Sequence, residues 1–444
     1  MSVKRLAILV GGGPAPGINA VLGAATIAAQ NRGIDVVGVY DGFKWLCSEK
    51  FQADEHTTPL TRQGVTRIHF AGGSILRTAR TSLLDDESLK TSTVVTPDTE
   101  KVATTVKNLR ALGVDALVTI GGDDTALSAR FICDATDGEL RVVHVPKTID
   151  NDLPLPHDVP TFGFSTAQHM GTQLVKNLMR DSQTTGRWYL VDTMGRRAGW
   201  LTLAIGMSAG ATVTLIPEEY PKRTTLSGIA DTLELAIVKR RTFGRSDGVA
   251  LIAEGLTYCL GDAEELERLL GRPVPLDAAG HPRLSEFPLA AMLKRELESR
   301  FKARKQPITL VTHTLGYELR CADPTPFDMA YCRSLAYFAI ILLHEASPST
   351  PRASMVSLVN GNVVAINLQE MIDPKTNRTR IRTVDIRSDM YRVARAYMIR
   401  LERGDLENPE ALARLAVEMK MTPEEFVKRY GDTATRLVNG VPAH

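Results

Sequence analysis

Two short apolar segments, each ending abruptly in small and acidic residues, constrain the fold of this chain more than any other feature. They run over Ala116–Ile120 and Val142–Val145, and a helix-compatible segment separates them. Short apolar runs bounded by glycine and proline are typical of buried strands, and a helical connection between two of them predicts a parallel pair. GGDDT follows the first segment and PKTIDND follows the second. Because ligands of open α/β sheets gather at the carboxyl ends of the strands, this stretch predicts a polar site at one sheet edge.

Five charged side chains are expected at that edge: Asp123, Asp124, Lys147, Asp150 and Asp152. Aspartate and glycine are also ordinary turn formers, which is the alternative interpretation. A turn alone does not require a lysine flanked by this many acids. The pattern therefore favours a binding or catalytic site.

The alternation of strand and helix signals continues through most of the chain. Further strands are expected at Leu6–Val10, Val36–Tyr40, Trp188–Asp192, Ala211–Ile216, Gly248–Ala253 and Ile308–Thr312, and a hairpin over Ala353–Leu368. Helices are expected at Ile18–Ala29, 99–113, 166–182, Gly199–Ser208, 224–241 and Pro326–Ala346. This order predicts an α/β fold of two Rossmann-like, doubly wound lobes with mainly parallel sheets, followed by a helical C-terminal tail.

The same signals predict the boundaries of these parts. The N-terminal lobe is expected over residues 1–160, completed by residues 320–385, and the second lobe over residues 161–319. Residues 256–306 are charged, helical and interrupted by Gly and Pro, which predicts a peripheral helical insertion. Residues 386–444 form the predicted tail.

Composition limits the classes of partner. The 444 residues carry a formal net charge of only +2, so no global field favours nucleic acid or an anionic membrane. We expect no apolar run as long as the roughly twenty residues of a membrane span. The cysteines are odd in number and scattered, which favours a reducing, cytoplasmic environment over a disulfide framework or zinc site. They are Cys47, Cys133, Cys259, Cys321 and Cys332.

Two other segments have the composition of anion-binding loops. Leu6–Val10 ends in GGGPAPG and an Ala-rich helix follows, an order that can point backbone N–H groups at a phosphate. The spacing fits neither common nucleotide-binding glycine pattern, so a plain tight turn remains the alternative. Arg77 and Arg80 lie beside a second Gly-Gly turn, where solvated surface arginines are the alternative.

Together these are the groups that phosphoryl transfer requires, because its catalysis is mainly positioning and charge neutralisation. Asp123 could bind Mg²⁺, which takes one or two carboxylates together with phosphate oxygens and water. Asp150 or Asp152 could accept the proton of a hydroxyl acceptor. Lys147 could neutralise the phosphate that leaves or is transferred.

Eight motifs then occur in a fixed order: GGGPAPGINA, GGSILRTAR, GGDDTALSA, PKTIDND, TFGFSTA, MGRRAGWL, AEG and LGYELR. They resemble the successive signatures of the 6-phosphofructokinase family, from residue 4 to about residue 335. Diacylglycerol and NAD kinases share a similar GGDG-T turn but lack PKTIDND and MGR. The ordered set is therefore far more specific than the turn alone.

The resemblance implies roles for residues of the first lobe. Gly12 and Arg80 would contact the phosphoryl donor, and Asp123 would bind Mg²⁺. Asp152 would be a further acid near the metal. The triplet Thr148, Ile149 and Asp150 would surround the 1-hydroxyl of fructose 6-phosphate, with Asp150 as the general base.

The resemblance also implies residues for the sugar phosphate. Met194, Gly195 and Arg196 would form a substrate-binding loop, and Glu254 and Arg320 would bind the fructose moiety. Arg187 would reach the 6-phosphate of a neighbouring subunit, which implies a homodimer or homotetramer. Tyr317 stands where many members have histidine, and Val311 stands where a further arginine is expected.

Two departures from the ATP-using pattern predict the donor. Asp124 and Lys147 replace the two glycines of GGDG and PGTIDND, as in the diphosphate-dependent subclass. A carboxylate at position 124 would repel a nucleotide α-phosphate, and Lys147 suits a short, highly charged donor. We therefore expect reversible transfer from pyrophosphate, with an ATP-dependent enzyme or a non-catalytic sugar-phosphate sensor as alternatives.

Overall fold

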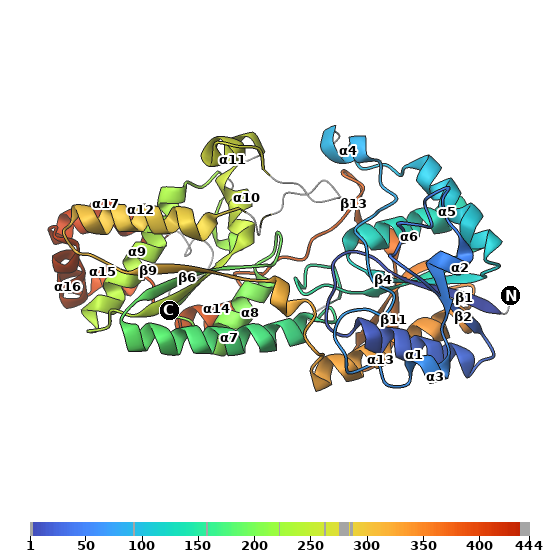
Figure 1. The fold of residues 1–444 in the computed structure, drawn as a ribbon. Coiled ribbons are helices and arrows are strands. Elements are labelled where there is room, and N and C mark those ends of the chain that lie inside the picture. Colours follow the sequence, from blue (N-terminus) through green and yellow to red (C-terminus); the bar gives the residue numbers. More distant parts are fainter. Residues whose placement is uncertain are drawn as a thin grey trace. The chain divides into compact units, whose positions relative to one another are not determined.

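The structure, a computed structural model, describes residues 3–91, 94–156, 159–221, 223–261, 263–274, 284 and 287–435. The chain forms two compact units. Unit 1 contains the described residues of Met1–Ala167 and Tyr317–Arg382. Unit 2 contains those of Gln168–Pro275, Arg283–Gly316 and Thr383–His444. Each is an α/β unit with its own sheet (Figure 1).

Unit 1 is built on a seven-stranded sheet in the order β11-β10-β5-β4-β1-β2-β3. Its strands are β1 (Arg5–Val10), β2 (Asp35–Val39), β3 (Thr57–Pro59), β4 (Ala116–Gly121), β5 (Arg141–Pro146), β10 (Ala353–Val359) and β11 (Asn362–Asn367). The five inner strands are parallel, and the two edge strands β3 and β11 pair antiparallel. All six residues of β4 are buried, which is why its sequence is continuously apolar rather than alternating.

Helices cover both faces of this sheet. Figure 1 places α1 (Ile18–Gln30) and α13 (Pro326–His344) on one face, and α5 (Thr99–Ala111) and α6 (Asp123–Ala135) on the other. A Cβ atom at Gly17 would lie 2.5 Å from Cys332 Sγ, so the glycine lets α1 approach α13 closely. Shorter elements complete the unit: α2 (Ala53–His56), α3 (Arg62–Val65), α4 (Asp86–Thr91), η4 (Tyr317–Leu319), η5 (Leu368–Met371), β12 (Ile372–Asp373) and β13 (Arg378–Thr379).

One helix contradicts the expectation that no segment reaches the length of a membrane span. By length and composition alone α13, with 19 residues and a mean hydropathy of 1.3, would suffice to cross a bilayer. Its residues Leu335, Ala339 and Ile340 are instead buried in the core beneath the sheet, against α1. The apolar side chains that face the core give α13 this composition.

Unit 2 has a four-stranded parallel sheet in the order β7-β8-β6-β9. Its strands are β6 (Trp188–Thr193), β7 (Val213–Leu215), β8 (Gly248–Ala253) and β9 (Leu310–Leu315). The helix α7 (Phe164–Thr185) belongs to unit 2 from Gln168 onward. The other elements of unit 2 before the tail are α8 (Trp200–Ala209), η1 (Pro217–Glu219), α9 (Leu226–Thr242), η2 (Glu254–Leu256), α10 (Thr257–Leu260), α11 (Ala263–Leu270) and α12 (Leu289–Ala303).

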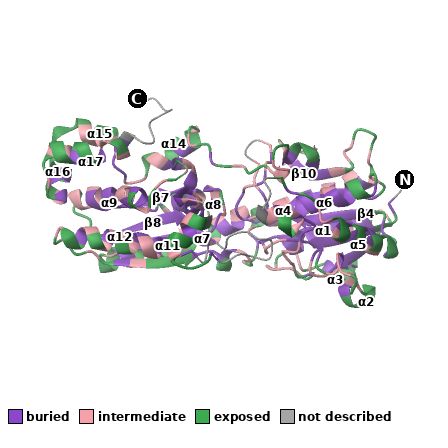
Figure 2. Cartoon of the chain, turned by 90° about the horizontal axis from the view of Figure 1, so that it is seen from above, coloured by how far each residue is buried: buried purple, intermediate pink, exposed green. Residues whose placement is uncertain are grey.

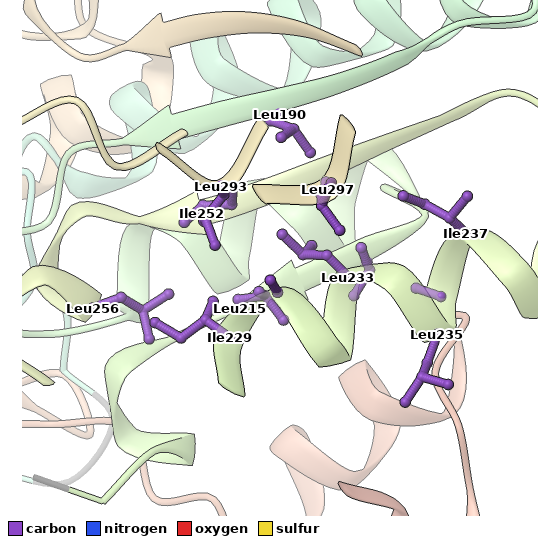
Figure 3. Close-up of a cluster of buried hydrophobic side chains, with 14 of the residues drawn as sticks. Leu190, Leu215, Ile229, Leu233, Leu235, Ile237, Ile252, Leu256, Leu293 and Leu297 are labelled. Atoms are coloured by element: carbon purple, nitrogen blue, oxygen red, sulfur yellow. The ribbon is translucent and has the colours of Figure 1, made fainter. Parts of the chain in front are cut away.

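The core of unit 2 corrects one prediction. Within the predicted peripheral insertion, α12 buries Leu293 and Leu297 against Leu233 of α9 and Ile252 of β8 (Figure 3). The helix is therefore part of the core and not peripheral. Its many charged residues misled the prediction, although one of them, Arg300, is largely buried and pairs with Glu234 of α9. Residues 262, 275–283, 285 and 286 of the predicted insertion lie outside the described residues.

The C-terminal tail is helical as predicted and packs onto unit 2. Its helices are α14 (Asp389–Ala396), α15 (Arg403–Glu407), α16 (Pro409–Met419) and α17 (Pro423–Thr435). Ser388 and Asn408 cap α14 and α16 by accepting backbone N–H groups, which satisfies donors that a helix start leaves open. Figure 2 shows buried residues along the strands and exposed ones on the outer helices, including α16.

The predicted fold class, α/β with mainly parallel sheets and a helical tail, is confirmed. The prediction missed β3, because the short sequence TTP has no apolar alternation and pairs only at the sheet edge. The prediction also began β9 two residues early: the strand runs from Leu310 to Leu315. The two units are less alike than two equal lobes, since their sheets have seven and four strands.

Candidate active site

The first group of candidate residues lies at the carboxyl edge of the unit 1 sheet, where β1, β4 and β5 end side by side. The strand pairing continues into the loops: Gly11 N donates to Ile120 O at 2.9 Å, and Lys147 N donates to Gly121 O at 2.8 Å. The GGG, GGDD and PKTIDND loops are thus held together by backbone hydrogen bonds, as parallel strand ends predict.

One side chain, that of Thr125, leaves room only for glycine at two positions of these loops. A Cβ atom at either Gly11 or Gly121 would lie 2.4 Å from Thr125 Oγ1. Thr125 belongs to the first turn of α6, so the glycines allow this helix to begin directly against the strand ends. Gly12 has φ +80°, a left-handed conformation that favours glycine.

Three cationic side chains converge on the Gly12–Gly13 backbone. Lys147 is buried, and its Nζ donates to the Gly13 carbonyl and lies 3.3 Å from a Cβ atom built on Gly12. At Gly13 the nearest atoms to such a Cβ are Arg320 Cζ at 3.7 Å and Arg80 Nη2 at 3.9 Å. Cations around a glycine loop form an anion-binding site, which favours the phosphate interpretation over a plain turn.

The acidic residues of this edge occupy two elements. Asp123 and Asp124 are the first two residues of α6 and are half-buried. Carboxylates at a helix N-terminus are stabilised by the helix dipole. Asp150 lies in the loop that follows β5 and is only 6% exposed. Its N–H donates to Thr148 Oγ1 at 3.0 Å. Ile149 is buried, and the Asp152 carbonyl accepts from Arg382 N at 2.8 Å.

Among the described residues, no group of three or more His, Cys, Asp or Glu side chains could hold a metal. An all-protein metal cage is therefore not found in that part of the chain. Mg²⁺ typically uses one or two carboxylates and completes its shell with phosphate oxygens and water. Asp123, half-buried at the start of α6, fits that smaller donor set.

The sequence did not single out two residues that organise these loops. The Arg382 guanidinium donates to Asn151 O at 3.2 Å and to Val159 O at 2.7 Å, and so fixes the PKTIDND loop. Asn151 itself has φ +57°, and its Oδ1 accepts from Thr161 N at 3.0 Å. No motif marks an arginine so distant in sequence, and only the fold reveals it.

His144 is the second missed residue. It is completely buried in β5, with Nε2 at 2.9 Å from Gly121 O and Nδ1 at 2.8 Å from Thr119 Oγ1. Because a carbonyl can only accept, Nε2 carries the proton and Nδ1 accepts the hydroxyl. Burial lowers the pKa of His144 to about 3, so the imidazole is neutral. It ties the end of β4 to β5, directly before the GGDD turn.

The second group of candidates lies in unit 2, at the ends of β6 and β8. Glu254 is buried, and its Oε1 accepts from Gly195 N at 3.0 Å and from Arg196 N at 2.8 Å. Arg196 has φ +51°, and a Cβ atom at Gly255 would lie 2.5 Å from its carbonyl oxygen. A Cβ atom at Gly316 would lie 2.6 Å from Met194. The loop that begins at Met194 is therefore tightly packed and held by Glu254.

A further carboxylate, that of Asp192, lies near the end of β6, just before this loop. Asp192 Oδ2 accepts from Ala290 N at 3.1 Å at the start of α12. Its buried Oδ1 has no hydrogen-bond partner among the described residues. Burial, and to a smaller extent the nearby Glu254 carboxylate, raise the pKa of Asp192 to about 7. No sequence pattern marks it, because an aspartate at a strand end is common.

The remaining candidates are more exposed. Arg187 Nε donates to Thr185 Oγ1 at 2.6 Å and lies 3.4 Å from the Asp181 carboxylate. Tyr317 is 60% exposed in unit 1, with the Arg320 guanidinium 5.1 Å from its ring centroid. Val311 lies in β9 opposite Tyr189, so the expected arginine is replaced by an apolar strand residue.

The structure thus brings the candidates together in two groups, one in each unit. Unit 1 holds Gly12, Arg80, Asp123, Asp124, Lys147, Thr148, Ile149, Asp150, Asp152, Tyr317 and Arg320. Unit 2 holds Arg187, Met194, Gly195, Arg196 and Glu254. A parallel α/β sheet whose strand ends present a cationic glycine loop and acids defines a class of protein, the phosphoryl-transfer enzymes that bind phosphates at a sheet edge.

Comparison with known proteins identifies the family within that class. Residues 5–343 match the phosphofructokinase family model, and the chain belongs to this family. It is 51% identical to a pyrophosphate–fructose 6-phosphate 1-phosphotransferase of Thermotoga maritima, over 97% of this chain and 99% of that protein. A protein of the same name from Naegleria fowleri is 41% identical, over 97% of this chain and 95% of its own.

A solved structure supports the fold alone. It is the crystal structure of the pyrophosphate-dependent phosphofructokinase of Marinobacter aquaeolei, with a TM-score of 0.63 and 16% identity. The alignment covers 94% of this chain and 91% of that one.

Proposed function

We propose that this protein transfers a phosphoryl group from pyrophosphate to the 1-hydroxyl of fructose 6-phosphate, giving fructose 1,6-bisphosphate and phosphate. The observation that carries the choice of donor is Lys147. Its buried ammonium group lies against the Gly12–Gly13 loop, in a position where the ATP-using pattern has glycine. The names of the Thermotoga maritima and Naegleria fowleri relatives agree with this reaction.

The donor site would consist of the glycine loop and the three cations around it. Lys147, Arg80 and Arg320 supply positive charge for a small anion that carries several negative charges. Asp124, at the start of α6, would repel the α-phosphate of a nucleotide by charge and by volume. A like-charge contact of this kind costs on the order of several kcal/mol in a site shielded from water. The pair Asp124 and Lys147 thereby selects pyrophosphate over ATP.

The chemical step uses the acids of the same edge. Asp150 accepts the proton of the sugar 1-hydroxyl while that oxygen forms a bond to the transferred phosphorus and the bridging P–O bond of pyrophosphate breaks. Asp123 would hold Mg²⁺, as phosphofructokinases generally use, and the ion would neutralise charge on the phosphate oxygens. Asp152 would be a further acid near the metal. Thr148 and Ile149 shape the loop around the acceptor hydroxyl.

In unit 2, the loop of residues 194–199, here called the sugar loop, and Glu254 would bind the sugar phosphate. In unit 1, Arg320 and Tyr317 are the further candidates for binding this substrate. Glu254 would bind the sugar while its Oε1 accepts hydrogen bonds from the backbone of the sugar loop. Arg187 would reach the 6-phosphate bound by a neighbouring subunit, so the active form would be a homodimer or homotetramer.

Steady-state assays with purified protein, fructose 6-phosphate and Mg²⁺ test this proposal. We expect high activity with pyrophosphate and little with ATP. Equal activity with the two donors would refute the choice of donor, and activity with neither would refute the enzyme assignment in favour of a sugar-phosphate sensor. Replacing both Asp124 and Lys147 by glycine should greatly reduce the pyrophosphate reaction, whereas an ATP-dependent enzyme would lose little ATP activity.

A further inference from the structure

The η1 turn, residues Pro217–Glu219, carries two adjacent carboxylates for which the proposed reaction has no role. Glu218 Oε1 accepts two backbone N–H groups, from Gly199 at 2.9 Å and from Val384 at 2.9 Å. Gly199 is the last residue of the sugar loop, and Val384 lies in the segment that leads into the C-terminal tail. One oxygen atom therefore joins two segments that are far apart in sequence.

The sugar loop is closely packed where Gly199 contacts Glu218. A Cβ atom at Gly199 would lie 2.4 Å from Ile216 Cβ and 2.7 Å from Glu218 Oε2. A Cβ atom at Gly255 would lie 3.1 Å from Pro217 Cγ and 2.5 Å from Arg196 O. Since Glu254 binds the amides at the other end of the loop, the η1 turn and the Glu254–Gly255 pair hold the sugar loop at both ends.

The tail side is anchored to the same turn by buried polar groups. Arg400 is 1% exposed, and its Nη2 donates to both carboxylate oxygens of Glu219 at 2.9 Å. The Tyr391 hydroxyl also donates to Glu219, and Tyr391 is buried with Val384 against Leu203 of α8. The segment from 383 onward lies beyond the part matched by the family model, which ends at residue 343.

We infer that Glu218 is a positioning residue for the sugar phosphate, which fixes the exit of the sugar loop to the C-terminal tail. The inference rests on the proposed function, in which the sugar loop binds fructose 6-phosphate. Glu218 touches no substrate itself. It sets the conformation of the loop backbone because the Gly199 amide and the Val384 amide share its Oε1. The tail is thereby part of the apparatus that binds the sugar phosphate.

Two replacements of Glu218 test whether this residue positions the sugar loop or only stabilises the fold. Glu218→Gln keeps an acceptor oxygen of the same reach, and its new amide takes the place of Oε2, which has no partner among the described residues. We expect it to behave as the wild type. Glu218→Ala removes the acceptor for both amides, and we expect the KM for fructose 6-phosphate to rise about tenfold while the KM for pyrophosphate changes less than about twofold.

A matched control is Glu234→Ala. Glu234 is a fully buried carboxylate of unit 2 that binds Arg300 and Arg304 and has no recorded contact with the sugar loop. It should lower the melting temperature without a selective change in either KM. The inference is overturned if Glu218→Ala leaves the KM for fructose 6-phosphate unchanged, or if it and the control change both KM values in parallel.

Hydrogen exchange tests the same link without turnover. In Glu218→Ala, peptides that contain Gly199 and Val384 should exchange faster than in Glu218→Gln, because both amides lose their acceptor. Equal exchange in the two variants would overturn the inference. If Glu218→Ala does not fold, Glu218→Asp replaces it, since the shorter side chain cannot reach both amides and should give the same effects at smaller size. A wild-type protein inactive with pyrophosphate would refute the proposed function instead, and the exchange result would remain interpretable.

Discussion

Removal of the positive charge of Lys147 should damage the use of pyrophosphate selectively. Lys147→Met keeps most of the buried aliphatic stem and removes the ammonium group that lies beside the Gly12–Gly13 loop. At about 4 Å and an effective dielectric constant of about 20, one charge pair is worth about 4 kcal/mol. Arg80 and Arg320 remain nearby and share the donor charge, so we expect a net loss of about 3 kcal/mol, roughly a hundredfold in kcat/KM for pyrophosphate.

The assay is steady-state kinetics with each substrate varied in turn. The KM for fructose 6-phosphate should change by less than about twofold, because the charge acts on the donor. Lys239→Met is the matched control, since Lys239 is a largely buried lysine of unit 2 that pairs with Asp405 at 2.6 Å. It should cost stability without affecting the donor. Unchanged kcat/KM for pyrophosphate in Lys147→Met, or an equal loss for both substrates, would refute the reasoning.

Three further outcomes follow from the structure. Asp150→Ser should retain binding of fructose 6-phosphate in calorimetry and abolish turnover, and unchanged turnover would contradict its role as the base. Asp192 holds its proton up to about pH 7 in the folded protein, whereas the unfolded chain releases it near pH 4, so its contribution to stability falls as pH rises between these values. In urea unfolding, the free energy of unfolding of the wild type should fall between pH 5.5 and pH 8, and Asp192→Asn should remove about 2 kcal/mol of that fall. An unaltered pH dependence in the variant would contradict the assignment. Leu293→Ala should cost about 2–5 kcal/mol in urea unfolding, and a cost below about 1 kcal/mol would contradict the placement of α12 in the core.

The sequence predicted the parts of the fold that depend on local pattern. β4 and β5 were recognisable because buried parallel strands are continuously apolar, and the tail helices because their patterning is helical. The convergence of the GGG, GGDD and PKTIDND loops followed from strand order, since parallel strands end at one edge. The edge strand β3 could not be predicted, because only its partner makes it a strand.

The supporting residues of the site were beyond the reach of sequence patterns for a different reason. His144, Asp192 and Arg382 act through contacts with residues distant in sequence, and no motif accompanies them. The role of Glu218 depends on where the tail returns to unit 2, which no local pattern specifies. The core position of α12 was hidden by its many charged residues, of which Arg300 pairs with the buried Glu234 of α9.

The central claim, that Asp124 and Lys147 make pyrophosphate the phosphoryl donor, is tested most directly by a competition between donors. Equal concentrations of pyrophosphate and ATP are mixed with limiting fructose 6-phosphate, Mg²⁺ and the wild-type protein, and the reaction is followed by ³¹P NMR. We predict that the pyrophosphate signal decays as phosphate and fructose 1,6-bisphosphate appear, while the three ATP signals remain constant. Conversion of ATP to ADP with the pyrophosphate signal intact would contradict the account.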